Sequence, residues 1–171
     1  PALIVDGKKI MDDYWTGEHG ELPEDKRITV DFLKQFRQVY VFISHEHPDH
    51  LDPVVFTWRS EAPVTYIVSA DMPVGTRGKR MAPGDSLTLS PEVSVKAFDS
   101  TDLGVSFLVD IQGVHVFHAG DLNFWHWREE STVKEIEEAD DAVRLHRDGV
   151  VMGDEDHSVP LPVQLFQKAQ H

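Results

Sequence analysis

Apolar and polar positions alternate in a way that predicts a hairpin, a helix and a buried strand in the first part of the chain. The segment ALIVDGKKIMDDYW (2–15) has two apolar runs joined at Asp6-Gly7, a pair that suits a tight turn, so it predicts a β-hairpin. TVDFLKQF (29–36) has apolar residues at helical spacing, and the unbroken apolar run 39–43 predicts a strand buried on both faces. The loop after that strand should lie at a sheet edge, where ligand sites of α/β proteins are usual.

Later in the chain, short strands dominate the pattern. A proline opens a predicted short helix at 53–58, and VTYIVSA (64–70) predicts a further strand. Four short β-like runs between residues 86 and 118 are separated by turn signals, which predicts an antiparallel meander. The segment 132–146 has a Thr and Glu capping pair followed by apolar residues at helical spacing, so we expect a helix there.

Length and composition limit the classes of protein that the chain can belong to. It has 171 residues, of which 40% are hydrophobic, and this predicts a single domain over residues 1–171. We expect a soluble, cytoplasmic protein, because no apolar run is long enough to span a bilayer and the first residues do not form a leader pattern. The absence of cysteine means that any metal must bind through His, Asp or Glu.

The charge disfavours a polyanionic partner. The formal net charge is −14, whereas binding to nucleic acid relies on Lys and Arg. The densest basic segment is GTRGKR (75–80), which lacks the Ser or Thr that follows the lysine of a phosphate-binding loop. We therefore predict a solvated loop there, with anion binding as the alternative.

The loop SHEHPDH (44–50) concentrates groups that bind metals. Buried imidazoles and carboxylates must be hydrogen-bonded or bound to a metal, and both are good ligands for zinc and similar ions. His45 and His47 are two positions apart, so both rings can point to one side of an extended stretch. Asp49 and His50 follow a proline and can turn toward a neighbouring position. This spacing suits two adjacent metal sites that share one loop.

Two motifs resemble those of a known family. SHEHPDH matches the H-x-H-x-D-H signature of the metallo-β-lactamase superfamily, and FHAGDLN (117–123) looks like its later G-D motif at a strand end. STDLGVSFLV followed by GDLNFWHW looks most like the lactonase-like, zinc-dependent hydrolase branch. The resemblance implies an α+β fold, the four-layer αββα sandwich, incomplete at both ends because the family's first strand and its usual ending are missing.

The resemblance also implies a set of ligands. His45 and His47 would bind a first metal, Asp49 and His50 a second, and Asp121 would bridge the two. A bound metal lowers the pKa of its water to about 7, which provides a nucleophile at neutral pH. Asp49 would orient that nucleophile or take its proton, so it is also the candidate catalytic residue. The implied cofactor is one or two Zn²⁺ ions, with Mn²⁺ or iron as alternatives.

The ligand set departs from the family pattern in two places. The family's middle histidine has no counterpart in FDSTDLG (98–104), where Asp99, Ser100 or Asp102 could supply an oxygen ligand instead. For the last histidine of the family, His157 is the one candidate at a suitable place. These departures leave room for a weak or incomplete site.

Five further residues are candidates for supporting roles. His115 and His118 have an odd spacing that places them on opposite faces of a strand, so at most one faces the site. His118 is a candidate hydrogen-bond partner of a ligand, with simple packing as the alternative. Asn123, Trp125 and His126 follow the G-D motif and are candidates for a substrate pocket, although such aromatic residues are more often core.

The sequence thus predicts a metal-dependent hydrolase. Its substrate would be a small molecule, either an ester-like compound, a lactone or a phosphorylated metabolite. One alternative is a degenerate or incomplete domain that binds one metal or none, and another is an iron-dependent oxidoreductase of the same fold. We expect neither a membrane nor a nucleic acid as partner, and the sequence leaves the oligomeric state open.

Overall fold

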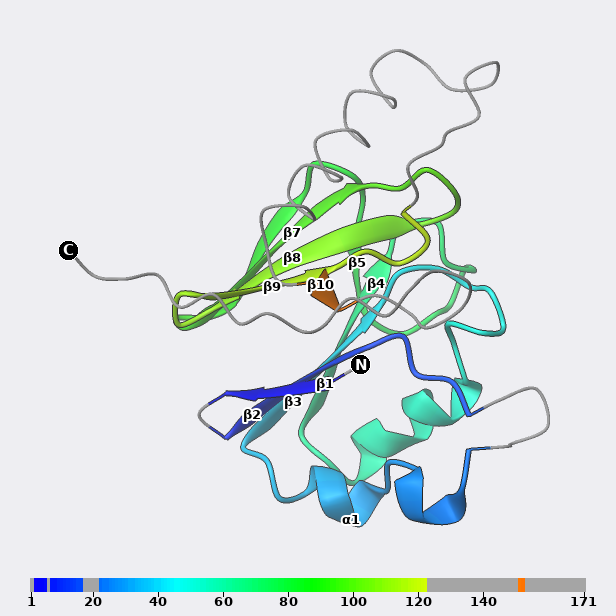
Figure 1. The fold of residues 1–171 in the computed structure, drawn as a ribbon, viewed down its shortest axis with the longest axis vertical. Helices are drawn as coiled ribbons and strands as arrows, with labels where there is room; N and C mark the ends of the chain where they lie inside the picture. Colours follow the sequence, from blue (N-terminus) through cyan, green and yellow to red (C-terminus); the bar gives the residue numbers. More distant parts are fainter. Residues whose placement is uncertain (1, 6, 17–21, 123–150, 153–171) are drawn as a thin grey trace. The chain divides into compact units, whose positions relative to one another are not determined.

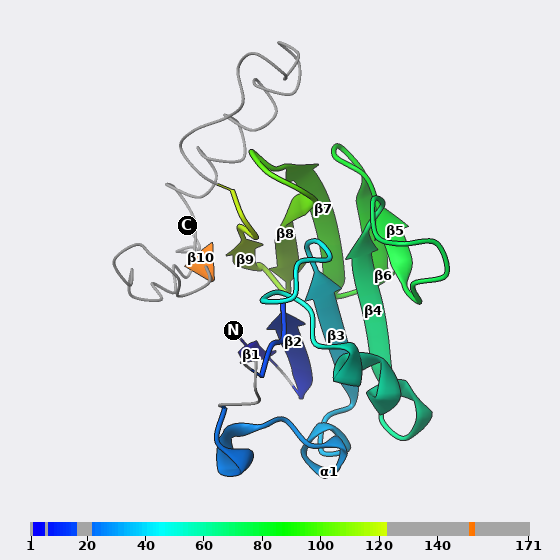
Figure 2. The same cartoon turned by 90° about the vertical axis from the view of Figure 1, so that its right-hand side faces the viewer.

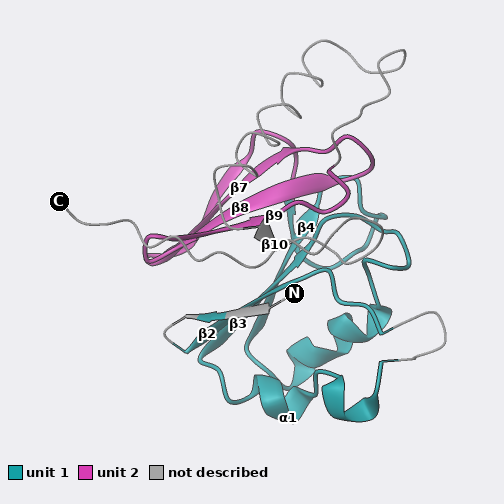
Figure 3. Cartoon of the chain, viewed as in Figure 1, with its two compact units in different colours: residues 1–80 teal, residues 81–171 magenta. Residues whose placement is uncertain are grey.

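The chain forms two compact units, residues 1–80 and 81–171 (Figure 3). The computed structural model describes residues 2–5, 7–16, 22–122 and 151–152. The described residues include two five-stranded sheets, and the helices are short.

The first sheet has the strand order β1-β2-β3-β4-β5 (Figure 1). Its strands are β1 Ala2–Val5, β2 Lys8–Asp12, β3 Gln38–Ile43, β4 Val64–Ser69 and β5 Lys79–Met81. The predicted hairpin is confirmed, since β1 and β2 pair antiparallel and Gly7 in the turn has a φ of 68°. β2, β3 and β4 run parallel, so their carboxyl ends lie at one edge of the sheet (Figure 2).

Short helices cover one face of this sheet. They are the 3-10 helix η1 Glu24–Lys26, the α-helix α1 Val30–Leu33 and the 3-10 helix η2 Pro53–Ser60. α1 is shorter than the pattern predicted, and it begins at the Thr29 hydroxyl, which accepts the Phe32 amide at 3.2 Å. Leu33 and Trp58 from the helices share one buried cluster with alternate residues of β3. β3 is buried on both faces from Val39 to Ile43, as predicted.

The basic segment 75–80 is only partly the solvated loop that was predicted. Its side chains are exposed, but Lys79 and Arg80 lie in β5. The Arg80 guanidinium donates to the carbonyl oxygens of Ala70 and Met72 at 2.9 and 2.7 Å and to that of Pro73 at 2.6 Å. Arg80 therefore stabilises the turn that precedes β5, and this use of its donors argues against an anion site.

The second sheet has the order β10-β9-β8-β7-β6. Its strands are β6 Ser86–Ser90, β7 Val93–Asp99, β8 Val105–Ile111, β9 Val114–His118 and β10 Val151–Met152. β6 to β9 pair antiparallel in sequence order, which confirms the predicted meander, and β10 adds a parallel pair to β9. Gln112 and Gly113 both have positive φ, 54° and 81°, as a two-residue hairpin turn requires.

The mixed helix and sheet class is confirmed, with more sheet than helix in the described part. The four-layer arrangement and the single domain over residues 1–171 stay predictions. The predicted helix at 132–146 lies outside the described residues. Of the helices that are described, none has the length and apolar character needed to cross a membrane.

Candidate metal centre

Two parallel strands bring the first part of the site together. Asp12 at the end of β2 is in register with Phe42 of β3, and the Asp13 amide donates to the Phe42 carbonyl at 3.0 Å. Asp13 therefore lies beside Ser44, the first residue after β3. Both positions follow the carboxyl ends of their strands, where the loops are held by a rigid sheet.

The histidine loop folds back on itself directly after β3. The His50 amide donates to the His47 carbonyl at 3.0 Å, which closes a turn around Pro48. As a result the His45 ring centroid lies 4.6 Å from that of His47 and 4.1 Å from that of His50. His45 and His50 are buried, His47 is half-buried, and Asp49 is exposed.

Asp13 is the hydrogen-bonding centre of this loop. Its Oδ1 accepts the Ser44 amide at 2.8 Å, and its Oδ2 accepts the Ser44 hydroxyl at 2.6 Å. The same Oδ2 lies 2.9 Å from Nδ1 of His50, and the Ser44 hydroxyl lies 2.8 Å from Nδ1 of His45. In both rings Nδ1 is the nitrogen that takes part in these hydrogen bonds.

The geometry of Asp49 and His50 fits one metal position. An Asp49 carboxylate oxygen lies 3.8 Å from Nε2 of His50. Two ligand atoms of a tetrahedral zinc ion are separated by roughly 3.4 Å when their bonds are about 2.1 Å long. The spacing is therefore close to what a shared ion needs. The neighbouring rings of His45 and His47 offer donors for a second ion on the same loop.

The second unit places its candidate residues at one edge of its own sheet. β7 and β9 run in the same direction, so Asp99 at the end of β7 and Asp121 shortly after β9 share this edge. The Thr101 hydroxyl lies 3.5 Å from the Asp121 carbonyl oxygen, which joins the two loops. One carboxylate oxygen of Asp99 accepts the Ser100 amide at 3.0 Å, and Asp102 is exposed. The ligand roles of these aspartates remain predictions.

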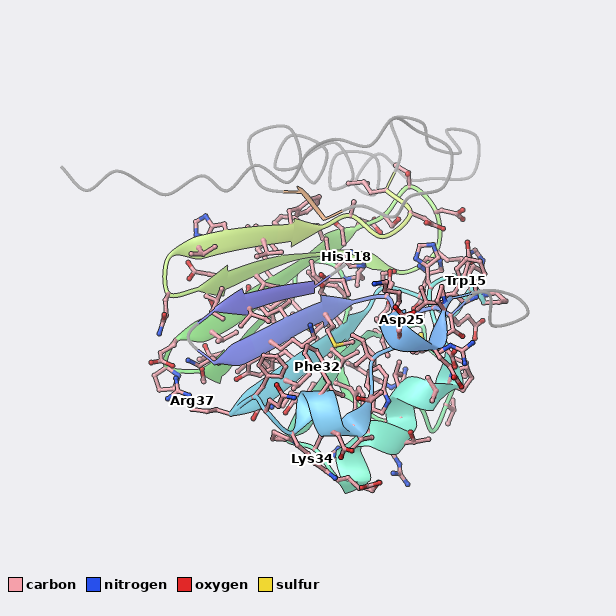
Figure 4. The ribbon with its side chains drawn as sticks, turned by 60° about the horizontal axis from the view of Figure 1, so that its bottom comes forward. Trp15, Asp25, Phe32, Lys34, Arg37 and His118 are labelled. Atoms are coloured by element: carbon pink, nitrogen blue, oxygen red, sulfur yellow. The ribbon has the colours of Figure 1, made fainter. Side chains whose placement is uncertain are left out.

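The two histidines of β9 lie on opposite faces, as their spacing predicted. His118 is fully buried and stacks on Phe107, with ring centroids 6.4 Å apart and planes inclined by 11°; His118 is labelled in Figure 4. His115 is exposed, and its Nε2 lies 2.9 Å from an Asp110 carboxylate oxygen. Whether His118 supports a ligand or serves only in packing stays a prediction. Asn123, Trp125, His126 and His157 lie outside the described residues.

Sequence reasoning missed two residues of the site, Asp13 and Ser44. In the sequence Asp13 looks like the second of two acidic residues at the end of a hairpin strand. A signal was present, because the end of a strand parallel to β3 must lie beside the loop that follows β3. To predict Asp13 in this way, one must know that β2 pairs with β3. Local sequence patterns do not show this pairing, because the two strands are far apart along the chain.

No family model and no curated protein matches the sequence. Solved structures are similar in fold. A protein of Parabacteroides distasonis named as a metal-dependent hydrolase is 18% identical, with a TM-score of 0.50 over 82% of this chain and 72% of that chain. Zn²⁺-bound PqqB from Methylobacterium extorquens is 14% identical, with a TM-score of 0.44 over 68% of this chain and 50% of that chain.

The MIM-2 metallo-β-lactamase is 11% identical, with a TM-score of 0.46 over 89% of this chain and 67% of that chain. At these identities the similarities concern the fold alone. The fold of this chain is that of the metallo-β-lactamase superfamily, as the histidine motif predicted.

Proposed function

We propose that the protein is a metal-dependent hydrolase of small molecules. Its first ion would be held by His45 and His47, its second by Asp49 and His50, and Asp121 would bridge them. Asp99 is the proposed oxygen donor where the family has its middle histidine. The observation that carries the proposal is the geometry of the loop, in which neighbouring rings and the 3.8 Å spacing between Asp49 and His50 suit two adjacent ions.

The donor chemistry favours zinc. Imidazoles with carboxylates and no thiolate suit Zn²⁺, and Mn²⁺ and iron accept the same residue types. When bound, such an ion lowers the pKa of water and polarises a carbonyl or phosphoryl oxygen. The Asp49 carboxylate is exposed beside Nε2 of His50, so it can orient the attacking water or accept its proton.

The substrate would be an ester-like compound, a lactone or a phosphorylated metabolite. The reaction would take place in the cytoplasm. The net charge of −14 supports a small substrate over a nucleic acid. Asn123, Trp125 and His126 are proposed to line the substrate pocket, and His157 to supply the last ligand. A single four-layer αββα domain would bring these residues together.

The test measures metal and activity on the same preparations. We expect elemental analysis to give one or two metals per chain, and a panel of lactones, thioesters and phosphodiesters to reveal a chelator-sensitive hydrolysis. His47→Ala should abolish the activity, and Asp49→Asn should lower kcat by about 100-fold or more, because it removes a positioned base. His115→Asn is the matched control, since His115 is an exposed histidine paired with Asp110. Hydrolysis that survives both chelation and His47→Ala would reject the proposal.

A further inference from the structure

We propose that Trp15 and Val54 form an apolar rim beside the histidine loop (44–50), and that this rim selects uncharged substrates that carry a ring. The inference rests on the proposed function and narrows its substrate class to neutral esters and lactones. Both residues would contact the part of the substrate that does not react. They would therefore determine specificity and take no part in the chemical step.

Trp15 and Val54 are large apolar side chains that the fold leaves in solvent. Trp15 is 38% exposed and Val54 is 39% exposed. Trp58, another tryptophan of the same unit, is 2% exposed and belongs to the core. A single exposed apolar side chain needs no explanation, whereas two of them beside one ligand loop indicate a contact surface.

Asp52 holds both residues of the rim just past the end of the histidine loop. Its Oδ2 accepts the Thr16 hydroxyl at 2.5 Å, and its Oδ1 accepts the Val54 amide at 2.9 Å. Its own amide donates to the Tyr14 carbonyl at 2.8 Å. The two neighbours of Trp15 in the chain and the backbone of Val54 are therefore bound to the same aspartate.

The ring of Trp15 does not take part in the core packing of its neighbour. Tyr14 packs its ring against Trp58, with centroids 5.1 Å apart, and its hydroxyl accepts the Ile28 amide at 3.0 Å. Tyr14 thus belongs to the cluster under the helices, and among the described residues Trp15 is not one of those that pack against this cluster. The chain holds Trp15 firmly at its backbone and leaves its indole available (Trp15 is labelled in Figure 4).

The segment that carries Trp15 also contacts the histidine loop directly. Asp13 lies two positions before Trp15, and its Oδ2 is 2.9 Å from Nδ1 of His50. Two residues of chain span at most about 7 Å, so the backbone of Trp15 stays close to the loop. Because the segment is bound on both sides of Trp15, the indole is kept beside the proposed ions.

The charges near the rim favour an uncharged substrate. Neither segment 12–16 nor segment 38–58 contains Lys or Arg, whereas Glu46 and Asp49 are exposed on the histidine loop. An anionic group on the non-reacting part of a substrate would meet carboxylates and no cationic side chain from these segments. A neutral ring would stack on the indole and bury apolar area. A lactone or a ring-bearing ester therefore fits the rim better than a phosphorylated metabolite.

The competing interpretation is that Trp15 only shields the histidine loop from water. Its loss would then lower stability or metal affinity and would reduce the activity on all substrates alike. A rim that contacts the substrate changes the ranking of substrates instead, because selectivity is a difference in transition-state binding. The test therefore compares substrates and does not rely on total activity.

A pair of esters tests the selection for a ring. Benzyl acetate and ethyl acetate release alcohols of similar reactivity, so they differ mainly in the ring. Trp15→Leu should lower kcat/KM for benzyl acetate by about 10-fold and affect ethyl acetate much less, because only the ring stacks on the indole. Val54→Ser should show the same selectivity with a smaller change. Phe32→Leu is the matched control, since Phe32 is 36% exposed and lies on α1. An equal loss on both esters would overturn the proposal.

A charged analogue tests the preference for neutral substrates. 4-(Acetoxymethyl)benzoate adds a carboxylate to the ring of benzyl acetate. Wild type should hydrolyse it with a kcat/KM about 10-fold lower at low ionic strength, and added salt should reduce the difference. A charged ester that is hydrolysed as well as the neutral one would contradict this part of the proposal.

Fluorine NMR of the chain labelled with 5-fluorotryptophan tests the contact without hydrolysis. The probe is 4-phenyl-2-butanone, in which a methylene replaces the ester oxygen of benzyl acetate, so it cannot be cleaved. It should shift the signal that Trp15→Phe lacks, and 2-butanone, which has no ring, should not.

This measurement decides if Trp15→Leu does not fold, and a Trp15 signal that does not respond to the probe would overturn the proposal. A response in a protein that hydrolyses no ester would support the rim and reject the proposed function.

Discussion

Lys9 is a charged residue that the fold buries almost completely. It is 4% exposed, and its ammonium nitrogen lies 5.1 Å from the ring centroid of Phe32 and 5.6 Å from that of Phe36 (Phe32 is labelled in Figure 4). Burial lowers the pKa of Lys9 below its ordinary value of 10.5. The two aromatic faces offset part of this desolvation cost through cation–π attraction.

This burial should make stability depend on pH. Below the lowered pKa of Lys9 the desolvation cost is present in full, and it disappears as the pH approaches 10.5, where the unfolded chain binds the proton more tightly. Wild type should therefore gain stability relative to Lys9→Met as the pH rises through the lowered pKa toward 10.5, because the wild-type desolvation cost declines over this range. Urea unfolding at several pH values measures the difference.

Lys34→Met is the control for this experiment. Lys34 is exposed, and its hydrogen bonds to Glu61 and Asp31 raise its pKa above 10.5. The stabilising contribution of Lys34 is fully present below pH 10.5 and is lost only at higher pH. The difference in unfolding free energy between Lys34→Met and wild type should therefore stay constant over the same pH range. If the difference in unfolding free energy between Lys9→Met and wild type is also constant with pH, the lowered pKa of Lys9 is contradicted.

Individual residues were predictable from sequence where the chemistry is local. The loop with His45, His47, Asp49 and His50 stands out because four metal-binding side chains follow a buried strand. Asp13 does not stand out, because its role depends on a strand pairing between distant segments. From the sequence alone, Lys9 would be predicted as an exposed residue of the hairpin. No residue near it in the sequence indicates that Phe32 and Phe36 cover it.

At the scale of elements, the turn before β5 depends on close backbone packing. Gly78 has a φ of 151°, and a Cβ atom there would lie 2.8 Å from Cγ1 of Val68 and 3.2 Å from Cβ of Tyr66. Both contacts come from β4, next to β5 in the sheet. The segment must therefore pass β4 without a side chain at this position.

Gly78→Ala should destabilise the protein more than a matched glycine does. Gly75 in the same loop also has a positive φ, 94°, but a Cβ there would meet nothing within 4 Å. Gly75→Ala should cost about 1 kcal/mol for the backbone alone. Gly78→Ala should cost about 1–3 kcal/mol more, because the methyl group overpacks the strand. Equal midpoints in urea unfolding would show that the clash relaxes freely.

Elements with a strong internal pattern were predicted well. The buried strand β3 and the meander β6 to β9 follow from apolar runs and turn residues, and the structure confirms both. β5 was missed because its Lys79-Arg80-Met81 sequence lacks a β pattern, and its position depends on Arg80 contacts with a neighbouring turn. α1 is shorter than predicted, because the helix ends at Leu33 and residues 34–36 form a turn, although Phe36 still packs against the same cluster.

At the scale of the whole molecule, the proposed ions should contribute to stability. A ligand present at about 100 times its Kd stabilises a folded chain by about 2.7 kcal/mol, which corresponds to about 5–10 °C in Tm for a protein of this size. We therefore expect a chelator to lower the Tm by about this amount, and added Zn²⁺ to restore it. Calorimetry measures both changes.

The net charge of −14 should strengthen this effect at low salt, because the acidic surface attracts cations. His47→Ala should reduce the response to chelator, and His115→Asn should preserve it. A Tm that does not respond to chelator in a preparation with bound metal would show that the ions are not coupled to folding.

The parallel pairing of β2 with β3 brings together residues that are translated at different times. Asp13 precedes Ser44, and Ser44 precedes each histidine of the loop. During synthesis Ser44 and His50 therefore leave the ribosome after Asp13, the carboxylate to which they hydrogen-bond. Asp13 and the histidine loop that contacts it are thus both translated before any strand of the second sheet.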